Sequence, residues 1–234
     1  MLSTASGLWS SGFPATRSSL VAGGLHPAFN DEWWFDPGRG GGILNAAGPH
    51  NIDRFRMWVG DIDAVSARLD VTRTRSADDG GAEDAYTAMF RMRNGATAVM
   101  QHGAATWGEP TYVFKLVGER GSITLGRDHA TLGRGSGDTA ELELPADLAL
   151  PDASVPAGDP KHAFTAIELP PFVRLAERFR EAIERSDPSW SPPGAPPTPT
   201  FADALAAQRV VDAMRHSSVE GGAWVEIAPV EEHR

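Results

Sequence analysis

The chain has 234 residues, 41% of them hydrophobic, and a formal net charge of −10 at pH 7. That length suits one large domain or two small ones, and the hydrophobic content is ordinary for a soluble globular protein. The negative charge argues against nucleic acid or an anionic membrane as a partner. The chain has no cysteine, which excludes disulfides and thiolate chemistry.

The N-terminal part predicts a loose segment followed by a helix. Residues 1–17 are rich in Ser, Gly and Pro, so we expect them to be loose, and residues 19–25 predict a short strand. This N-terminus lacks the charged start and apolar core of a signal peptide, and no stretch is long enough to span a membrane, so we expect a cytoplasmic protein. Apolar residues at near-helical spacing predict a helix over 42–59 that ends at Gly60. Pro49 lies inside this pattern and should bend or restart the helix.

Strands dominate the middle of the sequence. Polar and apolar residues alternate over 65–71, which predicts a half-buried strand. Two alternating runs flank Asn94-Gly95 and predict a hairpin with a type I′ turn. Further short strands are predicted at 111–118, 121–126, 129–134 and 140–145. Together these patterns predict an antiparallel sheet of roughly five to seven strands.

The C-terminal part predicts two helices. Residues 146–162 are rich in Pro, Ala and Asp and predict a long loop. Pro170-Pro171 should start an amphipathic helix, and residues 191–200 predict a semi-rigid proline linker. Thr200 and Asp203 form a capping box for a second helix.

The order of these elements predicts the fold class. Residues 223–227 predict a closing strand after the second C-terminal helix. A helix, many strands, two helices and a strand are typical of an α+β fold, with one open, mainly antiparallel β-sheet and helices packed on one face.

His50 and Asp53 are the first candidates for chemistry. They lie three residues apart and so share one face of the predicted helix. His50 could be a general acid or base, or it could be a packed histidine near a helix start, and the spacing alone favours neither. His102 could join the two residues at a metal, but no dense pattern of ligands is present and we expect no metal site.

Glycines and tryptophans surround this segment. The run Gly40–Gly42 could cradle a phosphate at the helix start. It matches neither the dinucleotide fingerprint nor the P-loop, so close packing of a loop on the helix is the preferred interpretation. Trp34 and Trp107 could stack on a sugar ring, although large aromatic residues are more often core. Trp107, in the loop after the predicted hairpin, is the better candidate for a pocket wall.

Residues 33–60, WWFDPGRGGGILNAAGPHNIDRFRMWVG, resemble the start of the C-terminal domain of Gfo/Idh/MocA oxidoreductases, the glucose–fructose oxidoreductase and inositol dehydrogenase relatives. The resemblance continues through EDAYTAMFRMRNGATAVMQ, FKLVGERGSITL, the helix around PPFVRLAERFREAI, and PTFADALAAQRVVDAMRHSSVEGGAWVEI. It implies a single substrate and oligomerisation domain over 18–234, of the glyceraldehyde-3-phosphate-dehydrogenase-like C-terminal type, with 1–17 outside it.

The resemblance also implies a site. Members of this family join the C-terminal domain to a Rossmann domain that binds NAD or NADP and carries a catalytic lysine in a Glu-Lys-Pro motif. An Asp-x-x-x-His pair from the C-terminal domain completes the catalytic set. His50 matches this histidine, whereas Ala46 stands where many members have the aspartate, and Asn45 could partly replace it as an orienting group. No GxGxxG or Glu-Lys-Pro occurs in the sequence, so we expect a truncated chain that binds neither NAD nor NADP and is inactive alone.

These considerations predict the substrate-binding half of an NAD(P)-dependent oxidoreductase acting on a sugar-like or cyclitol-like alcohol or carbonyl. His50 would be catalytic, Asn45, Asp53, Trp34 and Trp107 would bind or orient the substrate, and the sheet would form a homo-oligomer. One alternative is a non-catalytic binding or assembly module that pairs through its sheet. A weaker alternative is a metal-dependent sugar isomerase or hydrolase.

Overall fold

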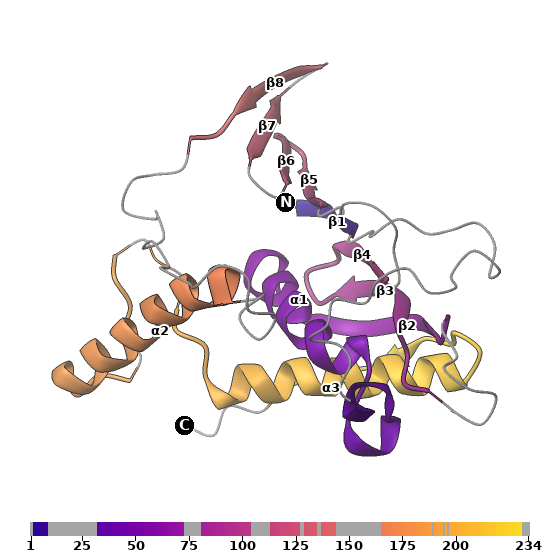
Figure 1. Ribbon diagram of the computed structural model, residues 1–234. Helices are drawn as coiled ribbons and strands as arrows, with labels where there is room; N and C mark the ends of the chain where they lie inside the picture. Colours follow the sequence, from indigo (N-terminus) through magenta and orange to yellow (C-terminus); the bar gives the residue numbers. More distant parts are fainter. Residues whose placement is uncertain are drawn as a thin grey trace. The chain divides into compact units, whose positions relative to one another are not determined.

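The structure is a computed structural model (Figure 1), and it forms two compact units, Met1–Leu142 with Ala202–Arg234, and Glu143–Phe201. The residues that it describes are 2–8, 32–72, 81–103, 113–126, 129–134, 137–143, 165–188, 190–193, 195 and 197–230. The larger unit holds a β-sheet and the helices α1 and α3, and the smaller unit holds the helix α2. In the described part of the chain, no helix has the length and apolar character needed to cross a membrane.

The described strands form one open sheet in the order β8-β7-β6-β5-β1-β4-β3-β2-β9. The strands are β1 (Leu2–Leu8), β2 (Ile62–Asp70), β3 (Ala85–Met92), β4 (Thr97–Gly103), β5 (Val113–Gly118), β6 (Gly121–Leu125), β7 (Ala130–Arg134), β8 (Asp138–Glu141) and β9 (Val225–Glu226). Neighbouring strands are antiparallel, except that β1 runs parallel to β4. The predicted strands of the middle and the closing strand are therefore confirmed, except that the strand predicted at 140–145 is observed at Asp138–Glu141.

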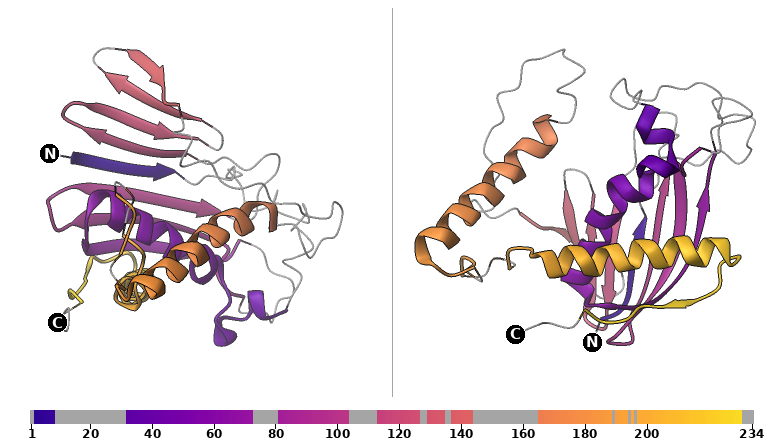
Figure 2. Two further views of the ribbon diagram at one scale, coloured as in Figure 1. Left: turned by 90° about the vertical axis from the view of Figure 1, so that its left-hand side faces the viewer. Right: turned by 90° about the horizontal axis from the view of Figure 1, so that it is seen from below.

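Two helices cover one face of this sheet. Figure 2 shows α1 (Ile43–Val59) and α3 (Phe201–Val219) on the same side of the strands, which confirms the predicted α+β fold. The core lies beneath them, where Phe55 of α1 stacks against Phe90 and Phe114 of the sheet at ring distances of 5.8 and 5.1 Å. Along β3, buried and exposed residues alternate, because successive side chains of a strand point to opposite faces.

The N-terminal segment differs from its prediction. Residues 2–8, expected to be loose, form β1 in the middle of the sheet, with β4 on one side and β5 on the other. Small residues such as Ser, Ala and Gly carry little strand propensity of their own. A central strand is stabilised mainly by its neighbours, since both of its edges form backbone hydrogen bonds.

The hairpin between β3 and β4 has a different turn from the predicted type I′. Its Met92 carbonyl accepts a hydrogen bond from the Gly95 N–H at 2.9 Å, and the Ala96 carbonyl accepts one from the Met92 N–H at 2.9 Å. Gly95 has a φ of 85°, whereas Asn94 is not in the left-handed region that type I′ requires. The Asn94 side chain instead donates to the Val59 carbonyl and accepts from the Ala96 N–H, so a contact with α1 decides the turn.

The helix boundaries were predicted with mixed success. Gly60 ends α1 as expected, whereas Gly42, predicted as the first helical residue, is its N-cap. The helix runs through Pro49 without restarting. In the smaller unit, α2 (Thr165–Arg185) begins before Pro170-Pro171, so both prolines lie inside the helix and do not start it. The strand predicted at 19–25 and the loop predicted at 146–162 lie outside the described residues.

Candidate functional site

The entrance of α1 is built by a tightly packed glycine turn. Two short 3-10 segments, η3 (Glu32–Phe35) and η4 (Pro37–Arg39), precede it. The N–H of Gly41 donates to the Asp36 carbonyl and that of Gly42 to the Trp34 carbonyl, each at 2.9 Å. A Cβ at Gly41 would lie 2.5 Å from the Trp34 carbonyl oxygen, closer than side chains approach backbone. Close packing of loop on helix is therefore the reason for this glycine, as predicted.

Glu83 occupies the N-terminus of α1. Its carbonyl accepts a hydrogen bond from the Ile43 N–H at 2.9 Å, and its carboxylate accepts one from the Leu44 N–H at 3.2 Å. A Cβ at Gly42 would overlap this carboxylate. Burial raises the pKa of Glu83, while hydrogen bonds from the backbone and the charge of Arg215 oppose that rise. The N–H groups of Ile43 and Leu44, which could hold a phosphate, thus already donate to the carbonyl and the carboxylate of Glu83. The diphosphate of a nicotinamide nucleotide does not fit here.

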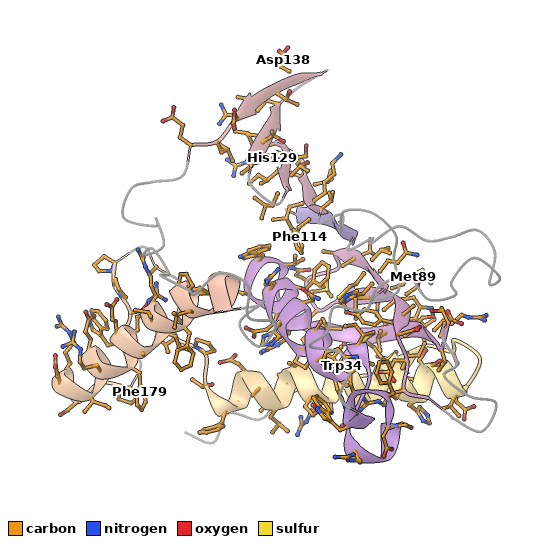
Figure 3. The ribbon with its side chains drawn as sticks, in the orientation of Figure 1. Trp34, Met89, Phe114, His129, Asp138 and Phe179 are labelled. Carbon is orange, nitrogen blue, oxygen red and sulfur yellow. The ribbon has the colours of Figure 1, made fainter. Side chains whose placement is uncertain are left out.

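Trp34 and Asn45 stabilise the same turn. Trp34, labelled in Figure 3, is half-buried against the core and meets Trp33 edge to face at a ring distance of 5.5 Å. The Asn45 side-chain amide donates to the Gly40 carbonyl at 2.8 Å. Both predicted site residues therefore lie at the helix entrance, where their observed contacts hold the backbone in place.

His50 lies on the exposed side of α1. Its neighbours in sequence are half-buried Pro49 and buried Asn51. Because proline has no N–H, the Asn45 carbonyl one turn earlier receives no helical hydrogen bond from position 49. Within the described residues, no hydrogen bond or ion pair engages the His50 ring. The histidine is therefore presented to solvent rather than packed into the core.

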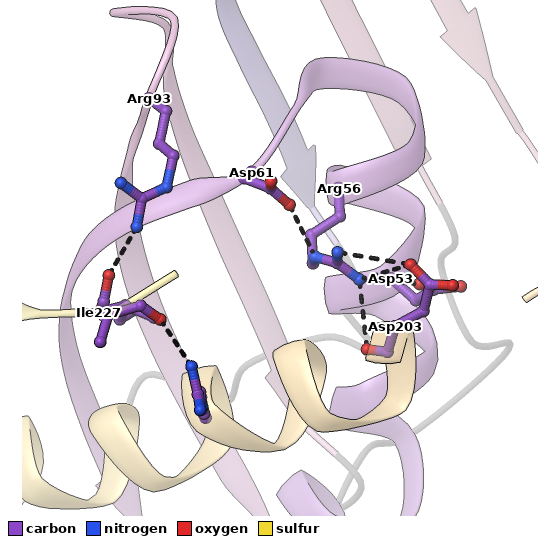
Figure 4. A network of polar contacts seen from close by, with 8 residues as sticks. Asp53, Arg56, Asp61, Arg93, Asp203 and Ile227 are labelled. Carbon is purple, nitrogen blue, oxygen red and sulfur yellow. Dashed lines mark hydrogen bonds and ion pairs between the residues drawn. The ribbon is translucent and has the colours of Figure 1, made fainter. Parts of the chain in front are cut away.

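Asp53 belongs to an ion-pair cluster around Arg56 (Figure 4). The Arg56 guanidinium lies 3.6 Å from the Asp53 carboxylate, 3.1 Å from that of Asp61 and 3.4 Å from that of Asp203. It also donates to the Asp203 backbone carbonyl at 3.2 Å. The cluster ties the C-terminal half of α1 to the first turn of α3, so Asp53 contributes to fixing the helix that carries His50.

A second group of polar residues is buried beneath α1. Asn51, Tyr86 and His102 are 8%, 1% and 7% exposed. The Tyr86 hydroxyl lies 3.4 Å from His102 Nδ1, and the two rings meet edge to face. Burial lowers the pKa of His102 to about 4. Burial also raises that of Tyr86 beyond its usual range, and the adjacent Asn51 amide opposes the rise.

From the sequence, His102 was a candidate only for a metal site, and neither Asn51 nor Tyr86 was a candidate site residue. Among the described residues, no three His, Asp or Glu side chains converge on a position that could hold a metal ion. One signal for the buried group was available in the sequence. Asn51 occupies a core-facing position of α1, in register with Leu44, Ile52 and Phe55. Trp107 lies outside the described residues.

Residues 17–124 match the profile of the GFO/IDH/MocA C-terminal domain. This stretch includes the helix entrance, α1 and the strands that bury Asn51, Tyr86 and His102. Over this stretch the chain is similar to the C-terminal domain of the GFO/IDH/MocA family. No curated protein sequence matches the chain.

Solved oxidoreductase structures share the fold of this chain. Levoglucosan dehydrogenase in complex with NADH and levoglucosan has a TM-score of 0.66 and 21% identity, over 98% of this chain and 59% of that one. An Agrobacterium radiobacter oxidoreductase in complex with NAD⁺, L-tartaric acid and magnesium has a TM-score of 0.65 and 18% identity, over 97% and 57%. A Kribbella flavida oxidoreductase domain protein has a TM-score of 0.67 and 20% identity, over 97% and 58%. The chain thus spans less than two thirds of the length of these oxidoreductases.

Proposed function

We propose that this chain forms the substrate-facing half of an NAD(P)-dependent oxidoreductase that acts on a hydroxyl or carbonyl group of a sugar-like or cyclitol-like molecule. The observation that carries the proposal is the exposed His50 imidazole on α1, in the segment that matches the Gfo/Idh/MocA domain. The solved neighbours support it, since levoglucosan dehydrogenase has been captured with NADH and either levoglucosan or L-sorbose.

His50 supplies the proton chemistry in this proposal. Oxidation of an alcohol releases the hydroxyl proton, which a neutral imidazole accepts, and in carbonyl reduction the imidazolium returns it. Nicotinamide, where it is bound, supplies the hydride chemistry. The helix entrance with its Glu83 carboxylate does not accommodate that nucleotide, so we assign it to another domain of the enzyme.

The remaining candidate residues orient His50 or line the site. Asn45 holds the glycine turn through its hydrogen bond to Gly40, and Asp53 holds the C-terminal half of α1 through Arg56. A rigid helix keeps the imidazole within the narrow range of positions that proton transfer requires. Trp34 lies at the start of this segment, and Trp107 remains a proposed wall of the substrate pocket.

The test pairs this chain with a Rossmann half of the same family, by fusion or co-expression, and follows nicotinamide reduction. His50→Ala should lower kcat about 10²- to 10⁴-fold, the contribution of a general acid or base. Met57→Ala is a matched control, because it truncates another exposed side chain of α1 and should leave turnover unchanged. Equal turnover of the wild type and His50→Ala would remove the histidine from the mechanism.

A second candidate function is assembly through the sheet face that α1 and α3 leave uncovered. On this face Met89 of β3 and Val99 of β4 lie directly opposite each other and are 48% and 37% exposed. Adjacent exposed side chains of this kind can pair with the same face of a second copy. Light-scattering mass in solution tests this candidate. An oligomer that Met89→Lys dissociates, and that Leu205→Lys on α3 leaves intact, supports it, whereas a wild-type monomer contradicts it.

A further inference from the structure

The helix α2 of the smaller unit carries an apolar surface that is exposed to solvent. Its large apolar side chains are 37–64% exposed, and they are Leu169, Phe172, Leu175, Phe179 and Ile183. Figure 3 labels Phe179 among the side chains that project from this helix. Soluble monomers rarely expose a large contiguous apolar surface, and one that they do expose usually marks an interaction site.

The spacing of the apolar residues is that of a helix that packs against another helix. Leu169, Phe172, Ala176, Phe179 and Ile183 follow one another in alternating steps of three and four residues. This is the pattern of a two-stranded coiled coil, in which each apolar side chain inserts between side chains of the facing helix. We call these residues the apolar line of α2. One facing helix of similar length would cover it.

The charges of α2 indicate what kind of helix this is. Its sequence contains four Arg and four Glu residues, so its formal net charge is zero, and none of them belongs to the apolar line. Arg180 and Glu184 pair within the helix at 2.8 Å. The chain as a whole carries a charge of −10, which opposes an anionic membrane as the occupant. The α2 helix of a second copy fits better, because two neutral helices do not repel each other.

Two α2 helices are complementary in antiparallel orientation. A two-fold axis between residues 177 and 178 places Phe179 of one copy opposite Ala176 of the other. The same axis places Phe172 opposite Ile183. Large side chains therefore face small ones at the centre of the interface, as close packing requires. The pair is also closed, because both copies use the same surface.

The size of the surface determines how tightly two copies can pair. With about 200 Å² for a fully exposed large apolar side chain, the exposed fractions amount to roughly 500 Å² per copy. A pair would bury about 1,000 Å² in total, which is the lower limit for a specific interface. Complexes of this size are weak and reversible, so the pairing should depend on protein concentration.

We propose that α2 is a dimerisation helix, which pairs in antiparallel orientation with the α2 helix of a second copy of this chain. The surface is separate from the uncovered sheet face, because α2 belongs to the smaller unit whereas Met89 and Val99 belong to the larger one. The pairing requires no role for His50, so it goes beyond the proposed function and does not depend on it.

Sedimentation equilibrium of the whole chain, from micromolar to millimolar concentration, measures the pairing. The wild type should form a reversible dimer. Phe179→Glu should raise the dissociation constant of the dimer at least about thirtyfold, the effect of losing a central aromatic anchor. Phe201→Glu is the matched control, because it makes the same substitution at a phenylalanine that lies outside α2 and is 96% exposed. This control should dimerise as the wild type does.

Disulfide cross-linking tests the orientation, since the chain has no cysteine of its own. Copies with Phe172→Cys are mixed with copies with Ile183→Cys under mild oxidation, and mass spectrometry identifies the products. The antiparallel register predicts disulfides that join one variant to the other. Two copies of the same variant should stay separate, because their substituted positions lie about 16 Å apart along the paired helices, beyond the reach of a disulfide.

Four results would contradict the proposal. The first is a wild-type chain that stays monomeric at millimolar concentration. The second is a dimer that Met89→Lys dissociates and Phe179→Glu does not, because the sheet face would then hold it together. The third is a disulfide between copies of the same variant, which excludes the antiparallel orientation. The fourth is a Rossmann half that displaces the second copy and loses its binding in Phe179→Glu, since α2 would then join two halves of one enzyme.

Discussion

Replacing Gly41 by alanine tests whether the glycine turn serves packing or phosphate binding. The added Cβ would lie 2.5 Å from the Trp34 carbonyl oxygen, whereas ordinary van der Waals contact begins at 3.4 Å, and it would also overlap the Trp33 carbonyl. Both obstacles are backbone, and the Trp34 carbonyl is held by the Gly42 N–H at 2.9 Å. Overpacking costs about 1–3 kcal/mol, and loss of that hydrogen bond adds about 1 kcal/mol. We expect Gly41→Ala to lower the free energy of unfolding by about 2–4 kcal/mol.

Urea unfolding measures this change, provided that the slope m stays constant. Gly95→Ala is the matched control, because a Cβ there meets nothing within 4 Å and only the positive φ is strained. That strain should cost about 1 kcal/mol after the reduced entropy of the unfolded chain is included. A Gly41 variant as stable as the Gly95 variant would refute the packing argument. If nicotinamide nucleotide affinity fell instead, the turn would be a phosphate cradle after all.

Two further perturbations test the supports of α1. Glu83→Gln should remove a pH dependence: a raised pKa means that the folded state holds this proton more tightly than the unfolded chain does. The free energy of unfolding of the wild type minus that of the variant should therefore fall as pH rises above 4.5, and it should level off beyond the raised pKa. Urea titrations at several pH values measure this difference, and an increase of the difference with pH would contradict the prediction. Arg56→Met should cost about 1–3 kcal/mol, because the 15% exposed guanidinium ties α1 to Asp203. Arg68→Met should cost less than about 1 kcal/mol, because the Arg68 side chain in the broken Arg68–Asp70 ion pair is 71% exposed. Equal losses of unfolding free energy in the Arg56 and Arg68 variants would refute this prediction.

Much of the sheet could be predicted from the sequence because one of its faces is buried. In β3, Tyr86, Phe90 and Met92 alternate with exposed residues, and this period of two is fixed by the strand itself. The limits of α1 were also local, since Gly42 and Gly60 adopt backbone conformations that few other residues tolerate. Local chemistry decided these features, so a single sequence contained them.

Features decided by distant contacts could not be predicted in this way. Strand β1 is stabilised by β4 and β5, which follow about a hundred residues later in the chain. The turn at Asn94 takes its form from a hydrogen bond to Val59, 35 residues away. Pro49 breaks the local pattern of a helix, but burial of Leu44, Ile52 and Phe55 on both sides of it keeps α1 continuous.

The candidate site shows the same division. His50 could be predicted as a site residue because the family resemblance lies in one continuous segment of the sequence. Its side chain is exposed, as contact with a substrate requires. The buried polar group did not emerge, because Tyr86 and His102 are 16 residues apart and meet only through the pairing of β3 with β4. The sequence contained one sign of this group, because Asn51 is a polar residue on the otherwise apolar, core-facing side of the helix.

The contacts that fix both ends of α1 bear on how the proposed enzyme would separate substrate binding from nucleotide binding. Glu83 fixes the N-terminus of the helix and the Arg56 cluster fixes its C-terminal half. His50 lies between these two anchors, so its backbone is held while its ring faces outward. The carboxylate that caps the helix is also what keeps a diphosphate away from it. In the proposed oxidoreductase, a helix built in this way would position a proton donor or acceptor beside the substrate, and another domain would bind the nucleotide.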